Sequence, residues 1–130
     1  MIVYYFDENM STPLANALND LGAGTSRFKV MTVIEEFNRV GATDPEIVDR
    51  LLQKDHRCVI VTCDSDFRKR QLYKLIIDSE NLGLLHIKFP RGAKAWDQYV
   101  FTITCWEKVT KLSKFPFLYV LKGNKKLYKI

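Results

Sequence analysis

Two short apolar runs constrain the fold of this chain more than any other feature of its sequence. Ile2–Phe6 and Cys58–Val61 carry β-branched, aromatic and other apolar side chains at consecutive positions, without alternating polar residues. Runs of this length and composition are typical of strands that are buried on both faces, as in a parallel sheet covered by helices. Acidic residues follow both runs closely. The sequence therefore predicts a sheet that is packed on both faces, with carboxylates where its strands end.

Helical patterns alternate with the predicted strands along the whole chain. With 130 residues there is room for one core, so we expect a single domain over residues 1–130. Its predicted class is α/β, a three-layer α/β/α domain with a central, mostly parallel sheet and a C-terminal helix plus β-hairpin. The expected strands are Ile2–Phe6, Phe28–Ile34, Cys58–Thr62, Leu84–Phe89 and the hairpin strands Phe117–Leu121 and Lys125–Ile130. The expected helices are Thr12–Gly22, Asp44–Lys54, Phe67–Ser79 and Trp96–Ser113.

Nothing in the sequence suggests a membrane or a secreted protein. No apolar run approaches the roughly 18 to 20 residues of a membrane-spanning helix, and the amino terminus lacks a basic leader with a small-residue cleavage site. The 3 cysteines are an odd number without C-x-x-C spacing, which argues against a disulfide framework and against a zinc site. We therefore expect a cytoplasmic protein with no membrane partner.

The charges are divided between the two halves of the chain. Residues 1–65 hold 6 Lys and Arg against 10 Asp and Glu, whereas residues 66–130 hold 14 against 5. Such a division suits a protein that holds a cation with carboxylates and offers a positive surface to phosphates. Lysines that merely solvate helix faces would give the same composition, so charge alone leaves both interpretations open.

A set of carboxylates is predicted to gather at one edge of the sheet. The set comprises Asp7, Glu8, Asp44, Glu46, Asp64 and Asp66. If the first and third strands are neighbours, their carboxyl ends meet at the edge where ligands bind in such sheets. Carboxylates in close contact raise each other's pKa values unless a divalent cation neutralises them. Oxygen ligands favour Mg²⁺ or Mn²⁺ over zinc, and such an ion can promote phosphodiester hydrolysis.

Several of these acids also have structural explanations. Asp44 is the expected N-cap of its helix, and Glu46 is a favourable first-turn charge. Asp66 can cap the helix that follows it. Glu8 is expected to point to the opposite side from Asp7 if the strand geometry continues. Asp7 and Asp64 therefore carry the metal-site interpretation most directly.

Three segments at these positions resemble a known family. "FDENM", "GATDPEIVDRL" and "VIVTCDSDF", in this order, resemble the PIN-like nucleases, especially the short branch that includes the VapC-type toxins. The resemblance covers roughly Ile2–Phe89, and the Trp96-Asp97 helix with the hairpin tail looks like that of a PIN-like subfamily. Its most specific element is the Thr-x-Asp-x-Asp-Phe signature over Thr62–Phe67.

The resemblance assigns roles to individual residues. Asp7 becomes the metal ligand of the first strand, and Asp64 and Asp66 become the acids of the third-strand loop. Thr62 resembles the hydroxyl that helps to fix that loop, and Asp44 matches the acid at the start of the middle helix. Larger PIN domains place a glutamate deeper in that helix, so the middle ligand stays open between Asp44 and Glu46.

The resemblance also implies an activity and partners. It implies an Mg²⁺- or Mn²⁺-dependent endoribonuclease, the toxin of a type II toxin–antitoxin system, neutralised by a small antitoxin protein encoded beside it. Many relatives dimerise, so a homodimer is a further expectation. The basic half supplies candidate contacts to RNA phosphates. These are Arg68, Lys69 and Arg70 after the acidic loop, and Arg91 and Lys94 after the fourth strand.

Two alternative functions remain at this stage. A PIN-like fold can bind RNA or a protein without cutting, although every expected acid is present here. A receiver-like phosphoacceptor domain also places acids after its first and third strands and a lysine at a later strand end, as Asp7, Glu8, Asp64 and Lys88 do here. Asp66 has no role in that arrangement.

Overall fold

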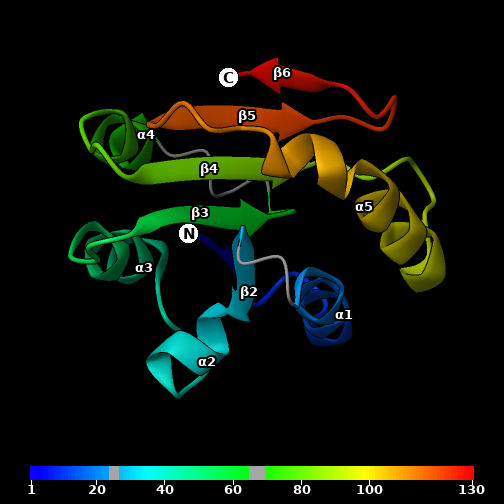
Figure 1. The fold of residues 1–130 in the computed structure, drawn as a ribbon, viewed down its shortest axis with the longest axis horizontal. Coiled ribbons are helices and arrows are strands. Elements are labelled where there is room, and N and C mark those ends of the chain that lie inside the picture. The colour runs from blue at the N-terminus through cyan, green and yellow to red at the C-terminus, as the bar shows by residue number, and fades with distance from the viewer. Residues whose placement is uncertain (24–26, 65–69) are drawn as a thin grey trace.

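A central sheet organises the protein in the computed structural model, which describes residues 1–23, 27–64 and 70–130 (Figure 1). Its strands are β1 (Ile2–Phe6), β2 (Phe28–Thr32), β3 (Arg57–Thr62), β4 (Leu82–Ile87), β5 (Phe117–Leu121) and β6 (Leu127–Lys129). They lie in the order β2-β1-β3-β4-β5-β6. Neighbouring strands from β2 to β5 pair parallel, and β6 pairs antiparallel with β5.

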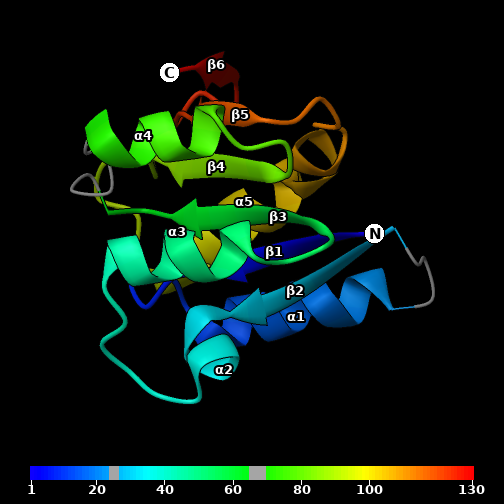
Figure 2. The ribbon, with the colours of Figure 1, turned by 90° about the vertical axis from the view of Figure 1, so that its left-hand side faces the viewer.

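Helices cover both faces of this sheet. They are α1 (Thr12–Gly22), α2 (Val33–Phe37), α3 (Asp44–Leu52), α4 (Arg70–Ile77) and α5 (Ala95–Thr110). Figure 2 shows α3 and α4 on the near side of the sheet and α5 behind it. None of the helices in the described ranges is long and apolar enough to cross a membrane.

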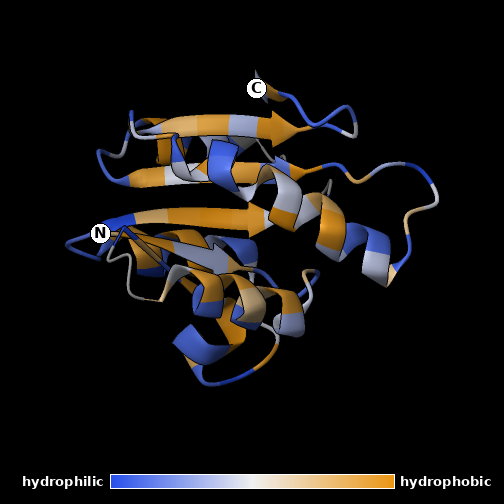
Figure 3. Cartoon of the chain, turned by 45° about the vertical axis from the view of Figure 1, so that its right-hand side comes forward, coloured by the Kyte–Doolittle hydropathy of each residue, from blue (hydrophilic) through white to orange (hydrophobic). Residues whose placement is uncertain are grey.

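Consecutive residues of β1 explain why its sequence has no polar face. Tyr4 and Phe6 pack into a core with α1 and α5, whereas Val3 and Tyr5 pack into a second core with α3 and α4. A strand between two such cores needs an apolar side chain at every position, because alternate side chains point to opposite faces. Strands β3, β4 and β5 are accordingly coloured mainly as hydrophobic in Figure 3. The predicted class, a three-layer α/β/α domain with a mostly parallel sheet, a C-terminal helix and a β-hairpin, is confirmed.

The second predicted strand is shorter than its sequence suggests. Phe28–Ile34 was expected to be extended, but the strand ends at Thr32 and helix α2 begins at Val33. The Thr32 hydroxyl accepts a hydrogen bond from the Glu35 backbone N–H at 3.1 Å and caps that helix. The cap turns the chain even though the β-branched Val33 and Ile34 favour a strand.

Other boundaries shift by one to three residues where they can be compared. The fourth strand begins at Leu82 instead of Leu84, and the last helix ends at Thr110 instead of Ser113. The helix expected over Phe67–Ser79 is described from Arg70, since residues 65–69 lie outside the described part of the chain. None of these shifts moves a predicted strand to another place in the sheet.

Candidate functional site

The first and third strands are neighbours, as the acid-edge hypothesis requires. Phe6 pairs with Val61 in the parallel register of β1 and β3, and the Asp7 backbone N–H continues the pairing by donating to the Val61 carbonyl at 3.1 Å. The order of the strands reverses between β1 and β3, because β2 lies on one side of β1 and β3 on the other. Ligands bind at the carboxyl ends of strands beside such a reversal. Asp7 and Asp64 both lie there.

Asp7 is buried beside Thr62. The Asp7 side chain and backbone together are only 7% exposed, which is unusual for an aspartate. The Thr62 hydroxyl donates to the Asp7 carboxylate and accepts from the Asp64 backbone N–H at 3.0 Å. One buried hydroxyl therefore contacts both acidic loops. The resemblance gave Thr62 a supporting role of this kind.

Burial and neighbouring charges make Asp7 difficult to ionise. Loss of hydration is the main cause, and together with the charges of Asp44 and Asp64 it raises the pKa of Asp7 to about 6. Hydrogen bonds from Thr62 and from the Asn9 backbone oppose the increase. The negative charges of Asp44 and Asp64, from two separate segments, therefore both act on Asp7.

Asn9 joins the two acidic loops, a role that sequence reasoning missed. Its backbone N–H donates to Asp7 Oδ1 at 3.0 Å, and its side-chain amide donates to Asp64 Oδ2 at 3.2 Å. The backbone carbonyl of Asn9 accepts a hydrogen bond from the Cys63 thiol, with 3.2 Å between sulfur and oxygen. An aspartate often binds a backbone N–H two residues on, so the first contact could have been expected. The contact with Asp64 spans 55 residues and depends on the tertiary fold.

The helix α3 is capped by Thr43, so the prediction that Asp44 is its N-cap was wrong. The Thr43 hydroxyl accepts from the Glu46 N–H at 3.3 Å, and Glu46 Oε1 accepts from the Thr43 N–H at 3.1 Å. This reciprocal pair is a capping box, a pattern that needs Thr or Ser three residues before Glu or Gln. Glu46 also forms an ion pair with Arg39, and these contacts lower the pKa of Glu46.

Glu8 holds the loop that leads to Asp44. Its carboxylate accepts a hydrogen bond from the Gly41 backbone N–H, although the two residues are 33 positions apart. Gly41 has a φ of +84°, a conformation that glycine adopts readily and other residues rarely. Glu8 therefore ties the segment between α2 and α3, which leads to Asp44, to the end of β1.

The remaining candidates divide into residues that the structure places and residues that it leaves out. Arg91 and Lys94 are exposed in the loop after β4, at the same edge of the sheet as Asp64. Asp66, Arg68 and Lys69 lie outside the described residues, and so does the side chain of Arg70.

The described residues fit a divalent cation in their chemistry but do not by themselves form a closed site. Within residues 1–23, 27–64 and 70–130, no three Asp, Glu, His or Cys side chains gather closely enough to hold a metal ion. The negative charges of Asp44 and Asp64 nevertheless act on the buried Asp7 carboxylate. A cation would relieve this repulsion, and an all-oxygen donor set suits Mg²⁺ or Mn²⁺.

The fold and this edge define a class of protein, an α/β domain with Asp7 and Asp64 side by side at the strand-order reversal. Residues 2–88 match the family model described as PIN like domain. Since the match covers more than half of the chain, this protein belongs to the PIN-like domain family. The comparisons find no match among curated proteins and none among solved structures.

Family membership indicates a nuclease-type module. PIN-like domains are generally nucleases, which are hydrolases, and they generally use divalent metal ions. The matched range runs from β1 to the end of β4 and includes Asp7, Asp44 and Asp64. Receiver domains share the parallel order 2-1-3-4-5, so strand order does not separate the two classes. The family match favours the PIN-like one.

Proposed function

We propose that this protein is a metal-dependent endoribonuclease that hydrolyses RNA phosphodiester bonds with Mg²⁺ or Mn²⁺. The observation that carries the proposal is the buried Asp7 carboxylate at the β1–β3 edge, which Asn9 joins to Asp64 and on which the charges of Asp44 and Asp64 act. Crowded acids at a ligand-binding edge are stable when a cation neutralises them. Asp7, Asp44, Asp64 and Asp66 are the proposed ligands, with Glu8 and Glu46 assigned to positioning the loop and helix that present Asp44.

Residues around the acidic edge hold the proposed ligands in place, and basic residues beside it contact the RNA. When bound, the ion supplies Lewis acidity, which activates water and offsets negative charge on the phosphate. Thr62 fixes the Asp7 carboxylate and the start of the Asp64 loop, and Asn9 orients Asp64 Oδ2. Such preorganisation reduces the rearrangement needed in the transition state. Arg91 and Lys94, with Arg68, Lys69 and Arg70, are proposed to position the RNA backbone.

The biological setting is part of the proposal. The resemblance of Ile2–Phe89 to VapC-type toxins supports a toxin of a type II toxin–antitoxin system, with a small antitoxin protein as partner, a homodimer as the assembled form and the cytoplasm as the location. A gene for a small DNA-binding protein next to this one would support the toxin role. Its absence would favour a nuclease that acts alone.

Cleavage of mixed cellular RNA by the purified protein, freed of any partner, tests the activity directly. We expect cuts with Mg²⁺ or Mn²⁺ and none with EDTA, because the proposed site has only oxygen ligands. Protein that binds RNA but leaves several RNA pools intact with either metal would overturn the nuclease proposal. The non-catalytic binding module would then replace it.

Substitutions at the start of α3 should separate the metal ligand from the helix cap. We expect Asp44→Asn to slow cleavage by at least about 10- to 100-fold, the range for groups that support a metal site, with little change in thermal stability. Glu46→Ala should lower the unfolding temperature, because it removes the capping box and the Arg39 ion pair, and should slow cleavage far less than Asp44→Asn does. The reverse pattern would make Glu46 the middle ligand.

A further inference from the structure

Trp96 is the most exposed large hydrophobic side chain in the described part of the chain. It is 73% exposed and lies in the first turn of α5. Tryptophan is highly buried on average, so an indole left in water is more informative than an exposed small side chain. Val100 and Ile103, one and two turns further along, are 47% and 40% exposed. These side chains line one face of α5 that contributes little to the core.

Basic residues lie in two neighbouring loops beside α5, of which one leads into its first turn and the other contacts it at Lys108. Lys88, Arg91 and Lys94 are exposed between β4 and α5, and Lys122, Lys125 and Lys126 are exposed between β5 and β6. No acidic residue occurs in either loop. The loops touch, since the Lys88 N–H donates to the Leu121 carbonyl at 2.8 Å and a Cβ on Gly123 would lie 3.3 Å from Pro90 Cα. We call residues 88–94 and 122–126 together the basic surface.

The loop that leads to Trp96 is well fixed. The Lys94 N–H donates to Asp97 Oδ2 at 3.1 Å, and the Ala93 N–H donates to the Pro90 carbonyl at 3.1 Å. The side-chain amide of Gln98 also binds the Ala93 carbonyl at 3.3 Å. Because the loop is already ordered, little conformational entropy is lost when a ligand binds to it, which favours affinity.

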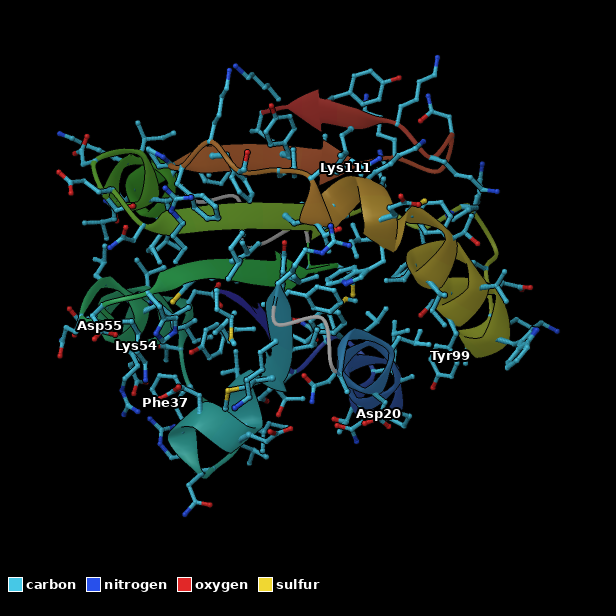
Figure 4. All side chains as sticks on the ribbon, in the orientation of Figure 1. Asp20, Phe37, Lys54, Asp55, Tyr99 and Lys111 are labelled. Carbon is cyan, nitrogen blue, oxygen red and sulfur yellow. The ribbon has the colours of Figure 1, made fainter. Side chains whose placement is uncertain are left out.

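Contacts connect the start of α5 to the acidic edge. Tyr99, one turn after Trp96, accepts a hydrogen bond from the Ser11 hydroxyl at 2.8 Å. Ser11 follows Met10, whose N–H donates to the Asp7 carbonyl at 3.1 Å. Figure 4 shows Tyr99 on the part of α5 that extends beside α1. The basic surface begins one strand away from Asp64, and neighbouring strands lie about 4.8 Å apart.

We propose that Trp96 and the basic surface bind single-stranded RNA, with the indole stacked on an unpaired base and the cations on flanking phosphates. An aromatic face among cations is the arrangement that binds single strands without base-specific hydrogen bonds. Duplex RNA keeps its bases stacked and hides their faces, so the surface selects unpaired RNA. The choice of RNA as ligand rests on the proposed function.

Binding measured in EDTA tests this surface without cleavage. We expect Trp96→Ala to weaken binding of a fluorescein-labelled oligouridine, followed by fluorescence anisotropy, by about tenfold, as for loss of one stacked base. Trp96→Phe should restore most of the affinity, because it keeps an aromatic face, and Trp96→Leu should not. Paired Arg91→Ala and Lys94→Ala substitutions should weaken binding and reduce its salt dependence. Circular dichroism checks that each variant is folded.

A matched control uses cations on elements other than α5 and the two basic loops. Lys29→Ala with Lys74→Ala removes the same charge from exposed positions on β2 and α4 and should leave binding close to wild type. Equal affinity of Trp96→Ala and wild type would overturn the proposal, and so would full affinity of Trp96→Leu. A wild-type dimer that becomes a monomer in Trp96→Ala, without loss of RNA affinity, would instead assign this face to a second copy of the chain.

Failure of the proposed RNA-binding surface can be distinguished from failure of the nuclease proposal. If RNA binding depends on Trp96 but the protein never cuts RNA with either metal, the proposed RNA-binding surface is supported and the proposed nuclease activity is contradicted. If the protein cuts RNA with metal but Trp96→Ala binds oligouridine as well as wild type does, the proposed nuclease activity is supported and the proposed RNA-binding surface is contradicted.

Discussion

Replacement of Asp7 by asparagine should reduce metal-dependent RNA cleavage by about a thousandfold. The substitution keeps the size of the side chain and removes the charge that lies deepest at the acidic edge. A Lewis-acidic ion contributes several kcal/mol to stabilising charge in the transition state, and each 1.36 kcal/mol corresponds to tenfold in rate. Single-turnover rates with saturating Mg²⁺ or Mn²⁺ give the measurement.

Asp20→Asn is the matched control for this variant. Asp20 is an exposed aspartate on α1 (Figure 4), so the same chemical change there should leave the rate near wild type. Asp64→Asn should resemble Asp7→Asn, because Asn9 and Thr62 hold the two acidic segments together. Cleavage by Asp7→Asn at the wild-type rate would show that catalysis takes place elsewhere on the protein.

The sheet could be predicted well because the side chains in the middle of its central strands are apolar at consecutive positions, which fits only a strand that is buried on both faces. Val59, Ile60 and Val61 are fully buried, and only a strand covered on both faces accommodates such a run. The start of α2 could not be predicted in the same way. Val33 and Ile34 favour a strand by their side chains, and a single hydrogen bond to Thr32 ends the strand. One local contact of this kind is weak as a sequence signal.

The candidate site was predictable in its location but not in its internal contacts. Strand ends placed Asp7 and Asp64 at one edge, because parallel strands share their direction. The partners of Asn9 and Glu8 lie 55 and 33 residues away, and no local pattern encodes them. The capping box at Thr43 was readable from Thr43-x-x-Glu46. It was missed because the adjacent aspartate is an equally good capping residue.

Asp7→Asn should also make the protein more stable at neutral and alkaline pH in the absence of metal. The folded state raises the pKa of Asp7 from 3.8 to about 6, so it binds the proton more tightly than the unfolded state does. The folded state therefore loses stability as the pH rises from about 4 to about 6, and the loss persists above that range. A pKa difference of about two, at 1.36 kcal/mol per pKa unit, corresponds to about 3 kcal/mol.

Urea unfolding at acidic and alkaline pH, in EDTA, measures this effect. The free energy of unfolding of Asp7→Asn should exceed that of wild type by about 2 to 3 kcal/mol at pH above 7, and the difference should shrink as the pH falls toward 4. Asp20→Asn should follow the wild-type pH dependence. A gain that is the same at every pH would point to packing instead of ionisation as its cause.

Added metal should reverse the order of stability. An ion that binds only the folded state stabilises it in proportion to the logarithm of its concentration, so Mg²⁺ or Mn²⁺ should stabilise wild type and have little effect on Asp7→Asn. The same buried charge would then destabilise the metal-free protein and hold the ion that catalysis needs. An Asp7 that stabilised the metal-free fold at alkaline pH would contradict this account, because the crowding of carboxylates around it is the reason for placing the metal at this edge.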